Sequence, residues 1–340
     1  MTVVRVALPV PLRQHFDYLI ASDQPCQIGC RVLVPFGNRQ LVGIIWQLAP
    51  EDGFDASKLK TILQLLDTAP VLPPLLCQLL SFAAEYYHYP LGEVLISALP
   101  ALLREGRNLT DYQPKAYRLT TAGQQLSATA LKRSAKQSAL WQALQSHQLT
   151  ESVLLQQHSR ATLKQLLDKQ LAEELIVPPL PFTAPLKPAT GLKLTSAQAL
   201  AVTAVDQACG RFERLLLEGV TGSGKTEVYL QIIAGLLNQQ QQVLVIVPEI
   251  GLTPQTLARF QARFDVPVLC WHSALSDSER LHCWLQASTG AAAIIIGTRS
   301  ALFLPFYRLG LIIIDEEHDQ SLKQQDGFRY HARDLAIKRA

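Results

Sequence analysis

Hydrophobic and polar positions in the first part of the chain alternate as they do in β-strands. Residues 30–35 and 41–46 are two such runs, and the five residues between them include Gly37 and Asn38. Two runs joined in this way predict a β-hairpin. From Pro73 to His88, leucine and alanine instead recur at helical spacing. We therefore predict a small β-rich domain, residues 1–105, that closes with helices and ends near Arg104.

The middle of the chain changes to a helical pattern. After a short apolar start at residues 117–119, the sequence predicts three helices, at 135–146, 150–157 and 161–174. Their size and order are typical of a winged-helix-like domain, here residues 115–177. A three-helix connector that touches no DNA fits the same pattern. Five prolines then predict a stiff linker over residues 178–191, and they stand at positions 178, 179, 181, 185 and 188.

Beyond residue 192, short apolar runs alternate with helical patterns. These runs are continuous rather than alternating, which is typical of strands in a parallel sheet that helices cover on both faces. We expect the strands at residues 214–218, 243–247, 266–271, 292–296 and 311–314. The whole chain is thus predicted to be an α/β protein of several domains.

Composition narrows the class of protein. Hydrophobic residues make up 48% of the chain, enough for buried cores, and no run approaches the ~18 apolar residues of a membrane helix. The six cysteines form no C-x-x-C pair, which argues against a zinc ribbon or a disulfide framework. We expect a cytoplasmic protein. The net charge is only +3, but residues 106–190 carry ten basic and five acidic residues, a surplus that suits either a phosphate backbone or an ordinary solvated face.

A phosphate-binding loop follows the predicted strand at 214–218. The motif G-x-x-x-x-G-K-[ST] is complete and leads into a helical run. Its glycines let backbone N–H groups point at phosphate oxygens. We expect Lys225 to contact the β- and γ-phosphates and Thr226 to hold Mg²⁺. The predicted ATP-binding residues are Gly219, Val220, Thr221, Gly222, Ser223, Gly224, Lys225 and Thr226.

Three acidic residues directly after the aliphatic run 311–314 predict the other half of the site. Asp315 is expected to hold Mg²⁺, Glu316 to orient or activate the attacking water, and His318 to sense the γ-phosphate. The order Asp-Glu-x-His resembles superfamily 2 helicases and translocases. Gln198, about 20 residues before the loop, stands where that superfamily has its adenine-reading glutamine.

Longer runs carry a more specific resemblance. They read VPEIGLTPQ at 247–255, WHSALSDSER at 271–280, GTRSALF at 297–303 and DEEHD at 315–319. Together they resemble the PriA family of primosomal replication-restart helicases, also called primosomal protein N-prime. The resemblance extends over the whole chain and is strongest from Gly219 onward. It implies a RecA-like first motor lobe at residues 192–340, preceded by a domain that binds 3′ DNA ends.

The resemblance also implies DNA contacts within that lobe. Thr253 and the pair Thr298-Arg299 match segments that contact single-stranded DNA in this class of motor. Residues 323–333 match an aromatic-rich loop that links DNA occupancy to ATP hydrolysis by stacking on bases. The contacts implied there are Lys323, Phe328, Arg329 and Tyr330. The chain departs from the family pattern at Leu322, where further aromatics are usual, and at Phe328, where the ring is usually larger.

A pocket for the 3′ end of a nascent strand is implied in the first domain. Phe16 and Tyr18 would stack on the terminal base, and Asp17 would accept a hydrogen bond from the 3′-hydroxyl. Gly37 and Lys60 match the remaining pocket positions. The residues alone predict something simpler, an edge-strand fragment whose aromatics pack in a core.

The family further implies ATP-dependent 3′-to-5′ unwinding, recognition of stalled or restarted forks, and the start of primosome assembly in the bacterial cytoplasm, with the nucleoid. Its cofactors are ATP and Mg²⁺. Its partners are forked DNA, single-stranded DNA, 3′ ends, single-strand binding protein and primosome proteins, with no membrane. The second motor lobe with its arginine finger and the zinc module have no counterpart here, so Zn²⁺ is expected only in that missing carboxy-terminal part. Because an arginine finger contributes ~10³ to 10⁵ in rate, we expect this chain to bind nucleotide weakly and hydrolyse it poorly.

Two other functions fit the same motifs. The chain would act as a DNA-fork-binding module if its ATP site were idle. A duplex-DNA translocase of the same superfamily, one that never separates strands, would carry the same first-lobe motifs.

Overall fold

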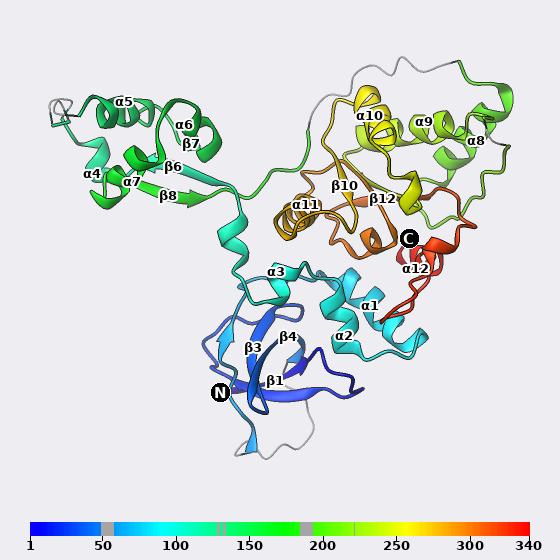
Figure 1. Ribbon diagram of the computed structural model, residues 1–340, viewed down its shortest axis with the longest axis horizontal. Helices are drawn as coiled ribbons and strands as arrows, with labels where there is room; N and C mark the ends of the chain where they lie inside the picture. The colour runs from blue at the N-terminus through cyan, green and yellow to red at the C-terminus, as the bar shows by residue number, and fades with distance from the viewer. Residues whose placement is uncertain (49–57, 128–129, 132–133, 184–192, 221) are drawn as a thin grey trace. The chain divides into compact units, whose positions relative to one another are not determined.

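The computed structural model describes residues 1–48, 58–127, 130–131, 134–183, 193–220 and 222–340. Two compact units divide the chain (Figure 1). One comprises Met1–Asn108 and Leu180–Ala340, and the other comprises Leu109–Pro179. The predicted Thr221 contact, Pro185 and Pro188 lie outside the described residues. Within the described ranges, no helix is both long enough and apolar enough to cross a membrane.

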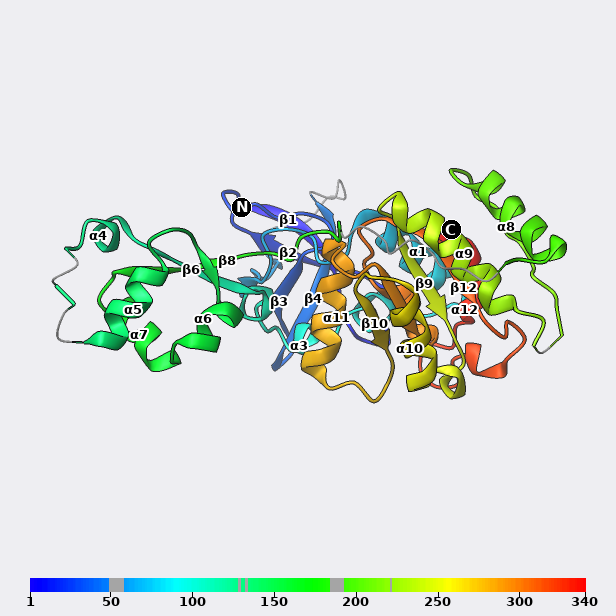
Figure 2. The ribbon, with the colours of Figure 1, turned by 90° about the horizontal axis from the view of Figure 1, so that it is seen from above.

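The chain begins with an antiparallel sheet in the order β2-β1-β4-β3-β5. Its strands are β1 (Thr2–Ala7), β2 (Phe16–Ile20), β3 (Arg31–Phe36), β4 (Arg39–Leu48) and β5 (Gln64–Leu65). The predicted hairpin is confirmed as β3 and β4, which lie side by side in Figures 1 and 2. Gly37 adopts φ +58° in the two-residue turn, a left-handed conformation that glycine reaches without steric cost.

Three helices close this sheet, as predicted: α1 (Pro74–Tyr86), α2 (Leu91–Ser97) and α3 (Ala101–Arg104). A buried ion pair fixes the end of α3 to the sheet. Arg31 of β3 donates from Nη2 to Asp67 Oδ1 at 2.6 Å and from Nη1 to the Leu103 carbonyl oxygen at 2.7 Å. Because the Arg31 side chain is fully buried, it needs every one of these acceptors.

The second unit combines three short strands with helices. After the 3₁₀ helix η2 (Leu109–Tyr112) come β6 (Lys115–Leu119), α4 (Thr121–Gln124), α5 (Ala135–Ala143), β7 (Leu149–Thr150), α6 (Glu151–Gln157), α7 (Arg160–Asp168) and β8 (Ala172–Ile176). The predicted helix 161–174 is too long. Gln170 adopts φ +55°, which ends the helix, and the next residues pair with β6 instead. Tertiary pairing therefore overrides the helical pattern at residues 172–174.

The third part of the chain is a parallel sheet in the order β10-β11-β9-β12. Its strands are β9 (Gln242–Ile246), β10 (Val268–Trp271), β11 (Ile294–Gly297) and β12 (Leu309–Ile314). The helices around it are α8 (Ser196–Ala208), α9 (Lys225–Asn238), α10 (Pro254–Arg263), α11 (Asp277–Thr289) and α12 (Ala332–Arg339). Short 3₁₀ turns lie at η3 (Glu249–Gly251), η4 (Arg299–Phe303) and η5 (Gln320–Leu322). The predicted α/β fold class is confirmed.

The strand predicted at residues 214–218 does not form. These residues are extended but pair with no strand of the described chain, and Leu216 is 70% exposed. An apolar run becomes a strand only where a neighbouring edge accepts its hydrogen bonds. Here β12 is the edge strand, and its residues from Leu311 to Ile314 are only half-buried.

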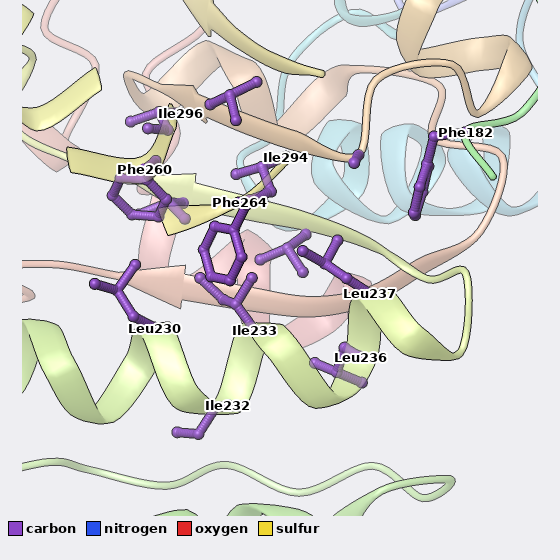
Figure 3. Packing of buried hydrophobic residues seen from close by; sticks show 14 of the residues in the cluster. Phe182, Leu230, Ile232, Ile233, Leu236, Leu237, Phe260, Phe264, Ile294 and Ile296 are labelled. Carbon is purple, nitrogen blue, oxygen red and sulfur yellow. The ribbon is translucent and has the colours of Figure 1, made fainter. Parts of the chain in front are cut away.

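The core of this part lies between α9 and the sheet. In Figure 3, Leu230, Ile233 and Leu237 point from α9 toward the strands, where Phe264 and Ile294 meet them. Phe182, within the predicted linker, also joins this core, and its N–H donates to the Gly290 carbonyl oxygen at 3.0 Å. The first residues of the predicted linker are therefore part of the folded unit.

One buried amide joins three segments of this part. Gln242 is 1% exposed, and its Nε2 donates to the carbonyl oxygens of Ala287 and Ala292 at 3.2 and 2.7 Å. Its Oε1 accepts from the N–H groups of Tyr307 and Arg308 at 2.8 and 3.0 Å. All four hydrogen-bonding positions of the side chain are used, so the amide fixes the segments that lead into β11 and β12.

Replacing Gln242 by leucine should therefore destabilise the protein. The change leaves two backbone N–H groups and two carbonyls without this partner, and we expect the free energy of unfolding to fall by about 3 kcal/mol. Urea denaturation followed by circular dichroism measures this. Gln239→Leu, at an exposed position nearby, is the control and should change stability by less than about 0.5 kcal/mol. Equal stability of the two variants would contradict the role given to Gln242.

Candidate nucleotide and DNA site

The phosphate-binding loop owes its shape to glycines. Gly222 and Gly224 adopt φ +80° and +83°, and Gly224 is the residue before α9 begins at Lys225. A Cβ at Gly224 would come 2.5 Å from Nε2 of Gln198, so a larger residue fits neither the backbone nor the space. The loop thus leads directly into a helix amino terminus, where N–H groups are free to bind an anion.

Two predicted ATP contacts lie against this loop. Lys225 Nζ donates to the Gly219 carbonyl oxygen at 2.6 Å. Gln198 caps α8 by accepting from the Thr195 N–H at 2.9 Å, and its Nε2 donates to the Ser223 carbonyl oxygen at 3.0 Å. Both side chains therefore bind the loop backbone in this structure. Their contacts with nucleotide remain predictions.

The acidic half of the site stands at the carboxyl end of β12. The Asp315 N–H donates to the Ile246 carbonyl oxygen at 2.9 Å and so extends the pairing of β12 with β9. Burial raises the pKa of the Asp315 carboxyl, the neighbouring Glu316 raises it further, and the positive charge of Lys225 lowers it.

Sequence reasoning missed a tyrosine that contacts the predicted magnesium ligand Thr226. Tyr229 Oη donates to Thr226 Oγ1 at 3.1 Å. Burial raises the pKa of Tyr229, and the charges of Asp315 and Glu316 raise it too. Tyr229 follows Thr226 by three residues on α9, a spacing at which helical side chains meet, so this contact was accessible from the sequence.

Glu316 has an unusual backbone. Its φ is +49°, a left-handed conformation that costs a non-glycine residue of order 1 kcal/mol. Its side chain is 55% exposed, and Oε2 lies 3.6 Å from His318 Nε2. Glu317, in contrast, is paired with Arg333 at 2.9 Å. The strained backbone turns Glu316 away from the line of β12, beside Asp315.

These residues suit a magnesium nucleotide. Thr226 supplies a hydroxyl and Asp315 a carboxylate, the hard oxygen ligands that Mg²⁺ takes together with phosphate oxygens. The glycines of the loop adopt backbone conformations in which successive N–H groups can face phosphate oxygens. Bound there, the ion would neutralise charge on the phosphates.

The predicted DNA contacts in the lobe are held by internal hydrogen bonds. Thr253 caps α10 and is exposed, whereas Thr298 is 6% exposed. Arg299 donates from Nη1 to the Ser321 carbonyl oxygen at 2.8 Å and from Nε to Gln324 Oε1 at 2.5 Å. Arg299 is thus tied to the segment that begins the aromatic-rich loop.

The rings of that loop are buried. Phe328 and Tyr330 are 7% and 5% exposed. Phe328 lies 6.0 Å from Tyr87 and 5.4 Å from Tyr89 between ring centroids, and Tyr330 lies 4.8 Å from Phe303. In this conformation neither ring is open to a nucleobase.

Other residues of the loop are more accessible. Lys323 Nζ donates to the Arg329 carbonyl oxygen at 2.7 Å and lies 5.1 Å above the Tyr87 ring, whereas the Arg329 side chain is exposed. Leu322, where the sequence departs from the family pattern, is 1% exposed and fills the core.

The residues predicted for the 3′-end pocket come from separate segments of the first domain. Phe16 is half-buried, with its ring 5.1 Å from Phe36, next to the Gly37 turn. Lys60 is exposed, and its carbonyl oxygen accepts from the Leu19 N–H of β2 at 2.9 Å. The structure thus brings Phe16, Gly37 and Lys60 into one domain from three segments.

Two residues of that pocket have other partners. Tyr18 is 5% exposed, belongs to the core and donates from Oη to the Pro35 carbonyl oxygen at 3.1 Å, so its ring is not open to a base in this conformation and its stacking role stays a prediction. Asp17 forms an ion pair with Arg5 at 3.0 Å. Sequence reasoning missed Arg5 because only the pairing of β1 with β2 places it opposite Asp17.

Comparison with known families matches both ends of the chain. Residues 5–100 match the model of the PriA 3′ DNA-binding domain, and residues 195–339 match the model of DEAD/DEAH box helicases. The first match covers the antiparallel sheet with α1 and α2, and the second covers the parallel sheet with the phosphate-binding loop.

Whole-chain relatives agree with these matches. The replication restart protein PriA of Haemophilus influenzae is 46% identical over 99% of this chain and 47% of its own length. Replication restart protein PriA of Rickettsia prowazekii is 31% identical over 100% of this chain and 41% of its own length. The chain therefore spans about half the length of the curated relatives it matches. By this alignment, and by a 3′ DNA-binding domain joined to a helicase lobe, the chain belongs to the PriA family of replication restart proteins.

Proposed function

We propose that this chain is the DNA-recognition and ATP-binding part of a 3′-to-5′ DNA helicase that binds stalled or restarted forks and begins primosome assembly. The observation that carries the proposal is that the phosphate-binding loop leads into α9, which packs on β9 and β12, while Asp315 directly follows β12 and bonds to Ile246 of β9. Such a pairing of a phosphate loop with an acid suits a magnesium nucleotide. Single-strand binding protein and primosome proteins are its proposed partners, and the bacterial cytoplasm its proposed location.

The side chains of the ATP site take separate roles in this proposal. Lys225 leaves the Gly219 carbonyl to bind the β- and γ-phosphates. Thr226, oriented by Tyr229, and Asp315 offer oxygen ligands to Mg²⁺. Glu316 accepts a proton from the attacking water, and its exposed, strained position leaves the carboxylate free to meet that water. His318, within 3.6 Å of Glu316, senses the γ-phosphate.

DNA recognition is proposed for two places. In the first domain, the Phe16 ring stacks on the terminal base beside Gly37 and Lys60, while Asp17 exchanges Arg5 for the 3′-hydroxyl. In the lobe, Thr253, Arg299 and the exposed Arg329 contact the backbone of a single strand. Stacking by Phe328 or Tyr330 requires the loop to leave Tyr87 and Tyr89.

A fork-binding module with an idle ATP site is the second candidate. Two observations favour it: Lys225 is held by a loop carbonyl, and Leu215–Leu217 before the loop is unpaired and exposed. A strand inside the sheet would hold the loop more rigidly.

Lys225→Ala distinguishes these two functions. The variant loses the cation that binds phosphate, so we expect nucleotide affinity to fall at least tenfold while fork affinity changes less than twofold. Titration with a fluorescent nucleotide and fluorescence anisotropy of labelled fork DNA measure the two affinities. Lys193→Ala, an exposed lysine before α8, is the matched control. Unchanged nucleotide affinity in Lys225→Ala would favour the idle-site module.

Glu316→Asn tests the strained backbone. Asparagine tolerates φ near +50° better than glutamate, so we expect stability to rise by about 0.5 to 1 kcal/mol while DNA-stimulated ATP hydrolysis is lost. Glu316→Gln removes the same charge but keeps the backbone cost, so it should lose hydrolysis without gaining stability. Both changes should also lower the pKa of Asp315 by removing a like charge. If Glu316→Asn and Glu316→Gln have equal melting temperatures, the backbone of residue 316 is not strained.

Asp17→Asn tests the 3′-end pocket. We expect the wild-type chain to bind a fork with a free 3′-hydroxyl about tenfold more tightly than one with a 3′-phosphate, because a phosphate there would meet the Asp17 carboxylate. The variant should lose most of this preference. Asp23→Asn, an exposed carboxylate of the same domain, should retain it. Equal affinity of the wild type for both forks would exclude the pocket.

A further inference from the structure

Two arginines share one small cavity without an acidic partner. The cavity has a volume of about 60 Å³, and it lies where α3 contacts α11 and η4. Arg104 at the end of α3 and Arg280 on α11 both line it, with Trp271, Ser300 and Asp277. Among the described residues, no carboxylate lies within 4.0 Å of either guanidinium, although Asp277 stands in the same wall.

The positive charges of this cavity are incompletely balanced. Burial lowers the pKa of Arg280, and the charge of Arg104 lowers it further, against an opposing effect of Asp277. Arg280 also lies 4.9 Å above the Trp271 ring, which holds the guanidinium in one place without neutralising it. Two guanidinium groups that repel each other gain from an anion between them.

A hydrogen-bond donor faces the same space. Ser300 Oγ accepts from Trp271 Nε1 at 2.9 Å, and no acceptor for its own O–H is found in the part of the chain that the structure describes. Two guanidinium forks and one hydroxyl match the oxygens of a tetrahedral phosphate. The volume of the cavity suits one such group and excludes a nucleobase.

We propose that Arg104 and Arg280 together bind one phosphate group of a DNA backbone, with Ser300 as a third donor. This site rests on the proposed DNA-binding function and deepens it. Ser300 directly follows Thr298 and Arg299, which the sequence places on the DNA path. Arg280 lies in the part that matches the helicase model, whereas Arg104 ends α3, just after the residues that match the 3′ DNA-binding model. One phosphate bound by both would therefore hold the end of the first domain against the helicase lobe. Such a contact fixes position and carries no base specificity.

The salt dependence of DNA binding tests the site. The 340-residue chain is titrated with labelled fork DNA at several KCl concentrations, as wild type, Arg104→Gln, Arg280→Gln and the double variant. Each single change should weaken binding about tenfold and lower the slope of log affinity against log salt by about one. In the double variant, the slope of log affinity against log salt should also fall by only about one, because both side chains hold the same phosphate. If the slope instead falls by about two in the double variant, the two arginines contact separate phosphates, and the shared site is overturned.

Controls separate this site from general effects. Arg308→Gln removes an exposed charge of the lobe that lines no such cavity and should leave the slope unchanged. Thermal unfolding checks that the variants are folded, and Arg104 is exposed, so its substitution should not disturb the core. Replacing single fork phosphates by neutral methylphosphonates should identify one position whose loss weakens the wild type but not Arg280→Gln.

Free phosphate is the other possible source of the ligand. If inorganic phosphate stabilises the wild type and neither arginine variant, while all of them bind DNA equally, the DNA assignment is overturned. If the wild type binds fork DNA and each single variant shows the same slope of log affinity against log salt, the phosphate site at Arg104 and Arg280 is excluded. The proposed function is unaffected by that result. If the wild type fails to bind DNA at all, the proposed function itself fails.

Discussion

The pairing of β12 with β9 is the constraint on which the ATP site depends. Parallel strands end at one edge of a sheet, so residues that follow them gather there. Asp315 continues this pairing by one hydrogen bond to Ile246, which fixes where its carboxyl lies. The helix α9 packs its apolar face on the strands of this sheet (Figure 3), and it begins with Lys225 and Thr226. Without this pairing of β12 with β9, the phosphate-binding loop and Asp315 would not be held at one edge of the sheet.

Three residues around this edge have a positive φ, a backbone conformation that most residues avoid. Gly222 and Gly224 turn the loop into α9, and Glu316 turns the chain just after β12. Glycine accepts such conformations at little cost, whereas glutamate does so only when the surrounding structure enforces them. Among the acidic residues that the structure describes, Glu316 alone has a positive φ.

A second set of contacts joins the helical end of the first domain to the helicase lobe. Tyr87 at the end of α1 accepts a hydrogen bond from the His331 N–H at 3.0 Å, and its ring meets Phe328. Phe328 lies in the aromatic-rich loop, residues 323–333, to which Arg299 is bound through Gln324, and Arg299 also donates to Ser321 just before that loop. DNA that moved Arg299 would thus disturb the same loop that contacts the first domain. Coupling between the two parts can travel through packed rings and hydrogen bonds without any long-range force.

The sequence by itself determined the local features of this protein. The β3–β4 hairpin, α1, the phosphate-binding loop before α9 and the acids after β12 follow from periodicity, glycine spacing and motif order, all of which act over a few residues. Prediction from the sequence was wrong where the secondary structure of a segment depends on a strand that is distant in the chain. Residues 214–218 have strand composition but no paired edge, and residues 172–174 have helical composition but pair with β6.

Only the tertiary structure decided which side chains are accessible and what they face. Four aromatic residues stand at positions that the family resemblance predicts to contact DNA, and of these only Phe16 is not buried; the others are Tyr18, Phe328 and Tyr330. Asp17 is paired with Arg5, and Arg104 shares a cavity with Arg280, across many residues of intervening chain. Burial and charge pairing depend on distances in space, and these arise only when the strands and helices pack.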